Sequence, residues 1–162
     1  MEFSESYLGK LRKVVGDRLI LVPGARIVMT DKAGRILLEL RKDFRAWGLL
    51  GGHQEVSDSI AATAVREVFE ESGFRIARPQ VFGIASDPRH ETVRFPNGDK
   101  TQSVAVLFHA RKPRGLAKFD AHEATDMQWF APDSLPKNVM PNSARTIKAF
   151  LRYQRTGAFQ MI

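Results

Sequence analysis

Three glutamates near the middle of the chain carry the clearest chemical signal in the sequence. Glu67, Glu70 and Glu71 fall within little more than one turn of a predicted helix, so their carboxylates crowd one face. Gly73 marks the C-terminal end of that helix, where the helix dipole disfavours negative charge and favours cations. Crowded like charges and negative charge at this end of a helix both lower helix stability. A sequence that keeps three glutamates there is typical of a site that holds a cation.

Clustered carboxylates suit a divalent cation such as Mg²⁺, which prefers oxygen ligands. Such an ion neutralises phosphate charge, orients phosphates and acidifies a bound water. The three glutamates would supply such a cluster from one rigid helix, and the backbone carbonyl of Gly52 could add a neutral oxygen where a glycine lets the chain approach closely. The alternative interpretation is a solvated helix face, because glutamate-rich runs are good helix formers.

The segment around these glutamates resembles the Nudix box, the signature of the Nudix (MutT-like) hydrolases. In the family's form, G-x5-E-x7-R-E-U-x-E-E-x-G-U with U a bulky apolar residue, eight of the nine defined positions match. The matching residues are Gly52, Arg66, Glu67, Val68, Glu70, Glu71, Gly73 and Phe74. Asp58 stands where the family has Glu. The wider layout is similar to a bacterial Nudix group of unassigned substrate.

The resemblance implies a fold and an activity. The fold would be α+β, a Nudix-type α/β/α sandwich with a mixed sheet and the box as loop-helix-loop. The activity would be hydrolysis of a pyrophosphate bond in a nucleoside diphosphate linked to another moiety, such as a nucleoside triphosphate or a nucleotide sugar. Mg²⁺ or Mn²⁺ would be the cofactor, bound by the Gly52 carbonyl, Glu67, Glu70 and Glu71. The alternative is a catalytically silent Nudix fold that binds a nucleotide or a partner.

Two further residues enter through the resemblance. Glu123 precedes Trp129 by about six residues, the spacing at which MutT-type members place a metal-binding or base glutamate. We expect Glu70 or Glu123 to deprotonate the attacking water; the plain alternative for Glu123 is a solvated loop acid. Arg66 lies four residues before Glu70 and matches the family's orienting arginine, although an ordinary ion pair at that spacing is the other interpretation.

Residues before the box are candidates for substrate contacts. Arg41 and Arg45 could meet substrate phosphates, although a solvated hairpin end fits them equally well. The aromatic rings of Phe44, Trp47 and Phe82 could stack on a base. For Trp47 a hinge-and-core role beside the glycine pair is the stronger interpretation.

Three positions depart from the common family form, and the first is Leu50, which stands where proline is frequent before the glycine pair. Ser57 replaces a frequent glycine, and a serine tolerates positive φ poorly, so we expect a different turn there. Asp58 is one methylene shorter than the family Glu, which reduces its reach toward Arg66 while suiting it to cap the helix. Glu55 could compensate as a nearby acid.

The whole chain limits the class of protein. Its 162 residues suggest one Nudix domain over 1–162, with an N-terminal helical extension at 1–16 and the box at 51–74. Neither a cysteine nor a long apolar run is present, which indicates a cytoplasmic protein without a membrane span. The net charge of +7 favours anionic small molecules over specific nucleic-acid recognition. Pairing into a homodimer is left open.

Periodicity and turn residues predict the elements that position the site. Strands are expected at 18–22, 25–30, 35–41, 81–86, 91–95, 101–110 and 127–130, with a loop over 42–57. Helices are expected at 7–16, 59–72 and 142–153, capped at Ser57 or Asp58 for the second and Asn142 or Ser143 for the third. The second helix would bury Ile60, Ala61, Ala64, Val65, Val68 and Phe69.

Overall fold

A nine-stranded mixed sheet forms the centre of the molecule in the computed structural model, which describes residues 3–111 and 113–162. The strands are β1 (Ile20–Thr30), β2 (Ile36–Arg41), β3 (Ala46–Gly48), β4 (Leu50–His53), β5 (Gln80–Ala85), β6 (Thr92–Arg94), β7 (Lys100–Arg111), β8 (Ala124–Phe130) and β9 (Gln160–Met161). The helices are α1 (Tyr7–Val15), α2 (Ile60–Ser72), α3 (Pro88–Glu91) and α4 (Pro141–Thr156), with a 3₁₀ turn at Phe3–Glu5.

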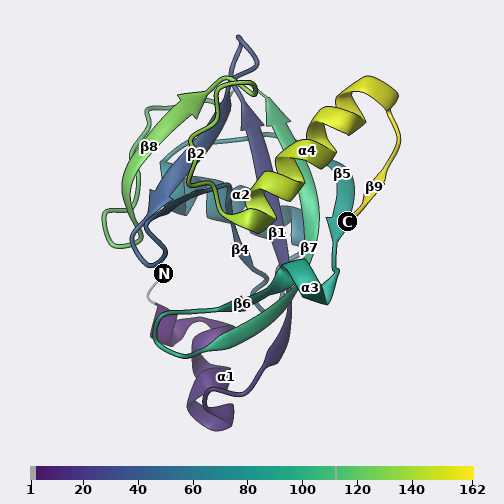
Figure 1. The fold of residues 1–162 in the computed structure, drawn as a ribbon. Helices are drawn as coiled ribbons and strands as arrows, with labels where there is room; N and C mark the ends of the chain where they lie inside the picture. Colours follow the sequence, from purple (N-terminus) through teal and green to yellow (C-terminus); the bar gives the residue numbers. More distant parts are fainter. Residues whose placement is uncertain (1–2, 112) are drawn as a thin grey trace.

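The sheet has the order β3-β2-β1-β7-β5-β9, with β4 also on β1, β6 also on β7 and β8 also on β2. The pairs β1–β7 and β5–β9 are parallel and the other pairs are antiparallel. Helix α4 crosses the front of the sheet and α2 lies behind it (Figure 1). This confirms the predicted α/β/α sandwich with a mixed sheet.

The alternation of side chains along β2 sorts residues between the two faces. Leu38 packs with Ile147 and Phe150 of α4, whereas Leu37 packs with Ala64 and Val68 of α2. Successive residues of a strand point to opposite faces. Residues 37, 39 and 41 therefore share the α2 face, so the end of β2 directs Glu39 and Arg41 toward the C-terminal half of α2.

β1 is one long strand, although the sequence predicted two strands closed at Pro23-Gly24. Pro23 pairs with Val104 of β7 in the parallel register, and its carbonyl accepts a hydrogen bond from Gln54 N (3.0 Å). The N–H and C=O of a strand residue point the same way, so the donor that proline lacks falls where β4 ends. Proline is tolerated at such an edge.

The predicted loop over 42–57 contains two short strands. β3 pairs with β2, and β4 pairs with β1 through Gly24↔His53, Ala25↔Gly52 and Arg26↔Gly51. The prediction was wrong here because the strands are only three and four residues long and their pairing partners are distant in sequence. The glycine pair of the box is thus held by a sheet ladder.

Helix α2 begins one residue later than predicted, and its N-cap is neither of the two expected residues. The side chain of Ser59, and not that of Ser57 or Asp58, accepts a hydrogen bond from Ala62 N (3.1 Å). Gly73 ends the helix in the left-handed conformation, with φ +70°, as expected.

The buried side of α2 also differs from the prediction. The helix buries Thr63, Ala64, Val68, Glu71 and Ser72. By contrast, Val65 and Phe69 are 38% and 46% exposed, and Ala61 is exposed as well. The helix is rotated so that an acid, Glu71, faces the sheet, which counting apolar residues could not foresee.

The remaining elements agree with the sequence in place and differ at their ends. β8 is longer than expected because it pairs with β2 from Phe130 back to Ala124. α4 begins at Pro141 with Met140 as N-cap residue, so the predicted caps Asn142 and Ser143 lie inside the helix. Gly157 ends α4 as expected. The very short α3 and β9 were not predicted.

Helix α1 packs at the lower end of the sheet (Figure 1), and a buried arginine fastens it there. Arg12 is 9% exposed and donates to the carbonyls of Gly16 (2.9 Å), Arg18 (2.6 Å) and Lys100 (2.5 Å). The predicted extension 1–16 begins with two residues outside the described ones. Within the described residues, no helix has the length and apolar character needed to cross a membrane.

Candidate functional site

A cavity of about 640 Å³ opens where α2, β4 and the end of β2 meet. Its size suits a small ligand of nucleotide class. Box residues Gly51, Gly52, Arg66, Glu67, Glu70 and Glu71 line it together with His122 and Glu123 of the loop before β8. Leu8 and Arg12 of α1 border it as well, as do Thr101 and Ser103 of β7. The predicted acids and the basic end of β2 therefore face one cavity.

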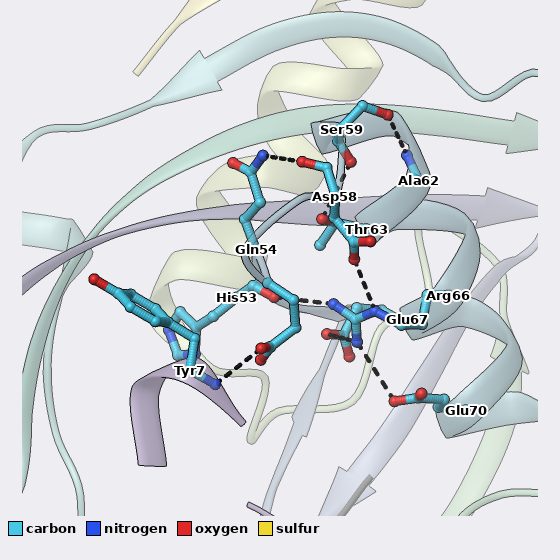
Figure 2. Close-up of polar contacts among 11 residues, drawn as sticks. Tyr7, His53, Gln54, Asp58, Ser59, Ala62, Thr63, Arg66, Glu67 and Glu70 are labelled. Carbon is cyan, nitrogen blue, oxygen red and sulfur yellow. Dashed lines mark hydrogen bonds and ion pairs between the residues drawn. The ribbon is translucent and has the colours of Figure 1, made fainter. Parts of the chain in front are cut away.

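Arg66 is the central brace of the box. Its guanidinium donates to Asp58 Oδ2 (3.1 Å), to Glu67 Oε1 (2.7 Å) and to the His53 carbonyl (3.1 Å), and it lies 3.4 Å from Glu70 Oε2. Figure 2 shows these contacts converging on the one side chain from the loop and from α2. A guanidinium with several donors in a fixed plane can orient more than one carboxylate at once. This arrangement supports the orienting role over an isolated ion pair.

The glycine pair lets two glutamates approach the backbone. A Cβ added to Gly52 would lie 2.4 Å from the carboxylate carbon of Glu67, so a larger residue would push that carboxylate away from the strand. The N–H of Gly51 donates to Glu71 Oε2 (2.9 Å). Glycine at 52 thus lets Glu67 lie against the strand that carries the predicted carbonyl ligand, whereas a Cβ at Gly51 would meet the backbone carbonyl of Ala25 at 2.2 Å.

Burial makes the acid cluster electrostatically costly. Glu71 is 4% exposed, and burial raises its pKa well above the usual range, with the Glu39 and Glu67 charges raising it further. Burial also raises the pKa of Glu67, against the lowering effect of Arg66. Negative charges held together out of water are stabilised by a cation placed among them.

Glu39 on β2 is a buried acid of this site that sequence reasoning missed. Burial raises its pKa to about 7 against the opposing charge of Arg41, while Glu123 and Asp43 raise it further. The available signal was a single charge inside the apolar strand Ile36–Arg41, on the face that the pleat assigns to α2. That face could not be assigned before the position of α2 was known.

The exposed acids complete the rim of the cavity. Glu70 and Glu123 are both exposed, and the loop of Glu123 is tied to β2 by a bond from Lys42 N to the Glu123 carbonyl (2.9 Å). Glu123 raises the pKa of Glu39, Glu67 and Glu71, so its charge acts on the whole cluster. The structure therefore brings this loop acid to the box glutamates, as the spacing to Trp129 suggested.

The donor set fits a hard divalent cation, although the side chains do not enclose one as they stand. Among residues 3–111 and 113–162, no three Asp, Glu, His or Cys side chains converge closely enough to form a ready metal cluster. Arg66 and the Gly51 N–H hold carboxylates that a cation would draw inward. Carboxylates together with a backbone carbonyl are the oxygen ligands that Mg²⁺ and Mn²⁺ accept.

The predicted substrate contacts divide into two groups. Arg41 and Phe44 line the cavity, where the Phe44 and Phe95 ring centroids are 5.6 Å apart and the Arg41 guanidinium lies 5.8 Å from the Phe44 ring. Among the described lining residues Arg45 and Trp47 do not appear. Arg45 is exposed on the turn before β3, outside the cavity.

Two of the aromatic candidates belong to the core. Trp47 is 8% exposed and packs edge-on against Phe130, with ring centroids 4.9 Å apart. Its backbone bonds to Asn138 and Met140 fasten β3 to the segment before α4. Phe82 is fully buried against Phe150 and Tyr153. Neither ring can stack on a ligand without leaving the core, so both are corrected to structural roles.

The unusual box-loop residues Ser57 and Asp58 are accommodated, and the contact between Asp58 and Arg66 is kept. Ser57 adopts φ +75°, so the left-handed turn is kept and the expectation of a different turn is wrong. Asp58 reaches Arg66 despite its shorter side chain. Glu55 does not join the cluster, because its Oε2 accepts the Tyr7 N–H of α1 (2.8 Å).

Comparison with known proteins decides the family. The family model described as NUDIX domain matches residues 21–150 of this chain. The chain belongs to the NUDIX family. The matched region begins after α1, so that helix lies outside the part shared with the family model.

Individual Nudix proteins show the same relationship. The chain is 32% identical over 127 residues to a Bacillus subtilis (strain 168) protein whose name as an 8-oxo-dGTP diphosphatase is provisional, covering 78% of each chain. It is 25% identical over 133 residues to a MutT-like protein of Streptomyces ambofaciens, covering 82% of this chain and 78% of that one. The crystal structure of a MutT NUDIX hydrolase from Burkholderia pseudomallei superposes with a TM-score of 0.68 at 23% identity, covering 80% of this chain and 97% of that one.

Proposed function

We propose that this protein hydrolyses a pyrophosphate bond in a nucleoside diphosphate linked to a second group, with Mg²⁺ or Mn²⁺ as cofactor. The observation that carries the proposal is the acid cluster, which Arg66 braces at the mouth of a nucleotide-sized cavity. Nudix hydrolases generally need a divalent metal ion. The proposed ligands are the Gly52 carbonyl, Glu67, Glu70, Glu71 and Glu123.

The chain's own residues supply binding, orientation and proton transfer. When bound, a divalent ion offsets phosphate charge and acidifies water. Glu70, at the exposed rim, is the proposed acceptor of the proton of the attacking water, and Glu123 is the second candidate. The water oxygen bonds to one phosphorus, the bridging P–O bond breaks, and two phosphorylated products leave. Arg66 keeps Glu67 and Glu70 aligned during this step.

Substrate orientation follows from the charges and rings at the cavity mouth. Arg41 stays protonated, because Asp43 holds its guanidinium with bonds of 3.0 and 2.7 Å, and it presents positive charge beside the acid cluster. The rings of Phe44 and Phe95 give a base a surface on which to stack. We therefore place phosphates between Arg41 and α2, and the base toward the two phenylalanines.

A substrate screen tests this proposal. Purified protein is incubated with nucleoside triphosphates, nucleotide sugars and dinucleotides, with Mg²⁺ and with Mn²⁺, and products are separated by ion-exchange chromatography. An oxidised dGTP belongs in the panel because of the name of the Bacillus subtilis relative. We expect two phosphorylated products from at least one compound. Tight binding of a nucleotide without turnover of any compound would contradict the proposal.

The variant Glu67→Gln tests whether hydrolysis in that screen depends on a proposed metal ligand of this protein or comes from a contaminating enzyme. It keeps the size of a side chain that must fit against Gly52 and removes one proposed ligand charge. We expect at least about 10²-fold slower turnover at a fixed metal concentration, since metal positioning contributes several kcal/mol. A preparation of this variant as active as the natural protein would show that another site or another protein does the hydrolysis.

A further inference from the structure

Glu39 has a side-chain oxygen that no contact in the described part of the chain explains. The residue is 1% exposed, and its Oε2 atom has no hydrogen-bond partner there. Its Oε1 atom lies 3.5 Å from Arg41 Nη1, at the outer limit of a hydrogen bond. A buried carboxylate that is poorly paired costs several kcal/mol. Its presence in the strand sequence Ile-Leu-Leu-Glu-Leu therefore points to a partner that the protein chain itself does not supply.

Arg41 is not that partner. Its Nε and Nη2 atoms donate to the two oxygens of Asp43 at 3.0 and 2.7 Å, the fork geometry in which a guanidinium binds a carboxylate most strongly. Only the remaining nitrogen, Nη1, approaches Glu39, and it approaches one oxygen. If Arg41 served only to stabilise the fold, its two-bond fork would be expected on the buried Glu39 and not on the more exposed Asp43.

The unpartnered carboxylate belongs to the sheet side of the acid cluster. Strand alternation places Glu39 on the α2 face, and Glu39 is the charged group that acts most strongly on the buried Glu71. Glu123 in turn is the acid that acts most strongly on Glu39. Acids from α2, from β2 and from the loop before β8 are therefore close enough for their charges to act on one another.

We propose that Glu39 is a further metal ligand, donating Oε2 from the sheet to the divalent ion that the α2 glutamates hold. The inference rests on the proposed function and adds to it a residue outside the box. A ligand on β2 would fix the ion against the rigid sheet as well as the helix. It also explains why the buried acid is kept, since the cation would satisfy the oxygen that the chain leaves unpaired.

The variant Glu39→Gln tests the proposal through two opposite effects. Removing a buried, poorly paired charge should raise the melting temperature of the metal-free protein. Removing a ligand should weaken Mn²⁺ binding at least about tenfold, by titration calorimetry and by the electron paramagnetic resonance of free Mn²⁺. The rise in melting temperature on adding Mn²⁺ should therefore be smaller for Glu39→Gln than for the natural protein. A merely structural role predicts the first effect without the second.

Two controls sharpen the experiment. Asp126→Asn makes the same change in net charge on β8, where the Asp126 carboxylate accepts hydrogen bonds from Met127 N and Gln128 Nε2. The Mn²⁺ affinity of this variant should stay within about twofold of that of the natural protein. Glu39→Asp keeps the buried charge and withdraws it by one methylene. It should weaken Mn²⁺ binding without stabilising the metal-free protein, and it decides the question if Glu39→Gln fails to fold.

The outcomes distinguish the ligand from the function. If Glu67→Gln weakens Mn²⁺ binding while Glu39→Gln binds like Asp126→Asn, the role of Glu39 is overturned and the proposed function stands. If the folded natural protein binds no Mn²⁺ by either method, the proposed function is overturned and the ligand role with it. Weaker binding in both glutamate variants, with a higher melting temperature in Glu39→Gln, supports both.

Discussion

The two faces of the central sheet use the same strands for opposite purposes. Toward α4 the sheet buries apolar and aromatic groups, including Phe82 and Phe150, whose ring centroids lie 5.5 Å apart. Toward α2 the sheet also buries an apolar cluster, but on this face β2 buries Glu39 and α2 buries Glu71. Both faces bury apolar clusters, but the buried Glu91 on the α4 face is paired with Arg26 at 2.7 Å, whereas on the α2 face the charge of Glu39 raises the pKa of the buried Glu71.

This difference shows where stability and chemistry are located. The closely packed apolar cluster around Phe82 and Phe150 has no polar group to offer a ligand, and Glu91 on the same face is already paired with Arg26. Buried acids are costly until a cation arrives, so the α2 face is incomplete by itself. Changes on the α4 face should therefore alter stability with little effect on metal binding, and changes on the α2 face should do the reverse.

The largest expected effect is on the α4 face. Phe150→Ala removes a ring that is 1% exposed and touches Phe82 and His109. We expect the free energy of unfolding, measured in urea, to fall by about 3–5 kcal/mol. Mn²⁺ affinity of the folded fraction should be unchanged. A large change in affinity with little loss of stability would show that the two faces are not separable.

Acid should destabilise the protein through His109, also on the α4 face. Burial, aided by Arg111, lowers its pKa from 6.5 to about 4, and its Nε2 lies 2.9 Å from Thr30 Oγ1. Between these values the unfolded chain binds a proton that the folded chain does not. Stability is therefore full above pH 6.5 and falls as pH decreases toward 4, by roughly 2–3 kcal/mol.

The measurement compares urea unfolding of the natural protein and His109→Gln at pH 7.5 and pH 4.5. Glutamine cannot take up the proton, so the variant should lose less stability than the natural protein over this interval. Other acidic groups titrate alike in both proteins and cancel in the difference. Equal losses would mean that His109 does not titrate in this range.

On the α2 face the expected effect is on turnover. Glu70→Gln removes the proposed proton acceptor at an exposed position. Turnover of the substrate found in the screen should fall at least about 10²-fold, equivalent to about 2.7 kcal/mol of activation free energy. The urea midpoint should barely move. With Asp126→Asn as the charge control, near-normal turnover of Glu70→Gln would transfer the role to Glu123.

The smallest effect concerns the box loop. Ser57 holds φ +75°, a conformation that glycine adopts without strain. Ser57→Gly should raise the free energy of unfolding by about 1 kcal/mol. Ser57→Ala keeps the Cβ and should give no gain, which makes it the matched control. An equal gain in both variants would place the cause in the serine hydroxyl and not in the backbone.

The predictable features of the fold and site depend on residues close together in sequence. The helix of the box, its end at Gly73 and the common face of Glu67, Glu70 and Glu71 need only helical spacing. The β2 strand and the turn before it were likewise expected, because alternation and turn residues are local signals. The spacing to Trp129 also indicated Glu123, through the family resemblance.

The misses depend on contacts that the apolar pattern of the sequence does not reveal. The buried side of α2 was wrong because Phe69 is covered by the Arg75 guanidinium, 4.8 Å from its ring, and not by the sheet. The packing of Trp47 against Phe130 and of Phe82 against Phe150 is what assigns both rings to the core and not to the cavity. An apolar residue in sequence does not say which surface will cover it.

The identity and the common face of the helix acids follow from local spacing, because residues three and four apart meet on any helix. The groups that join them are selected by packing between distant segments. The register Ala25↔Gly52 holds the glycine strand against Glu67, and the pleat of β2 turns Glu39 toward Glu71. These meetings depend on strand pairing between distant segments, so a buried acid such as Glu39 acquires a role only once the sheet and α2 are in place.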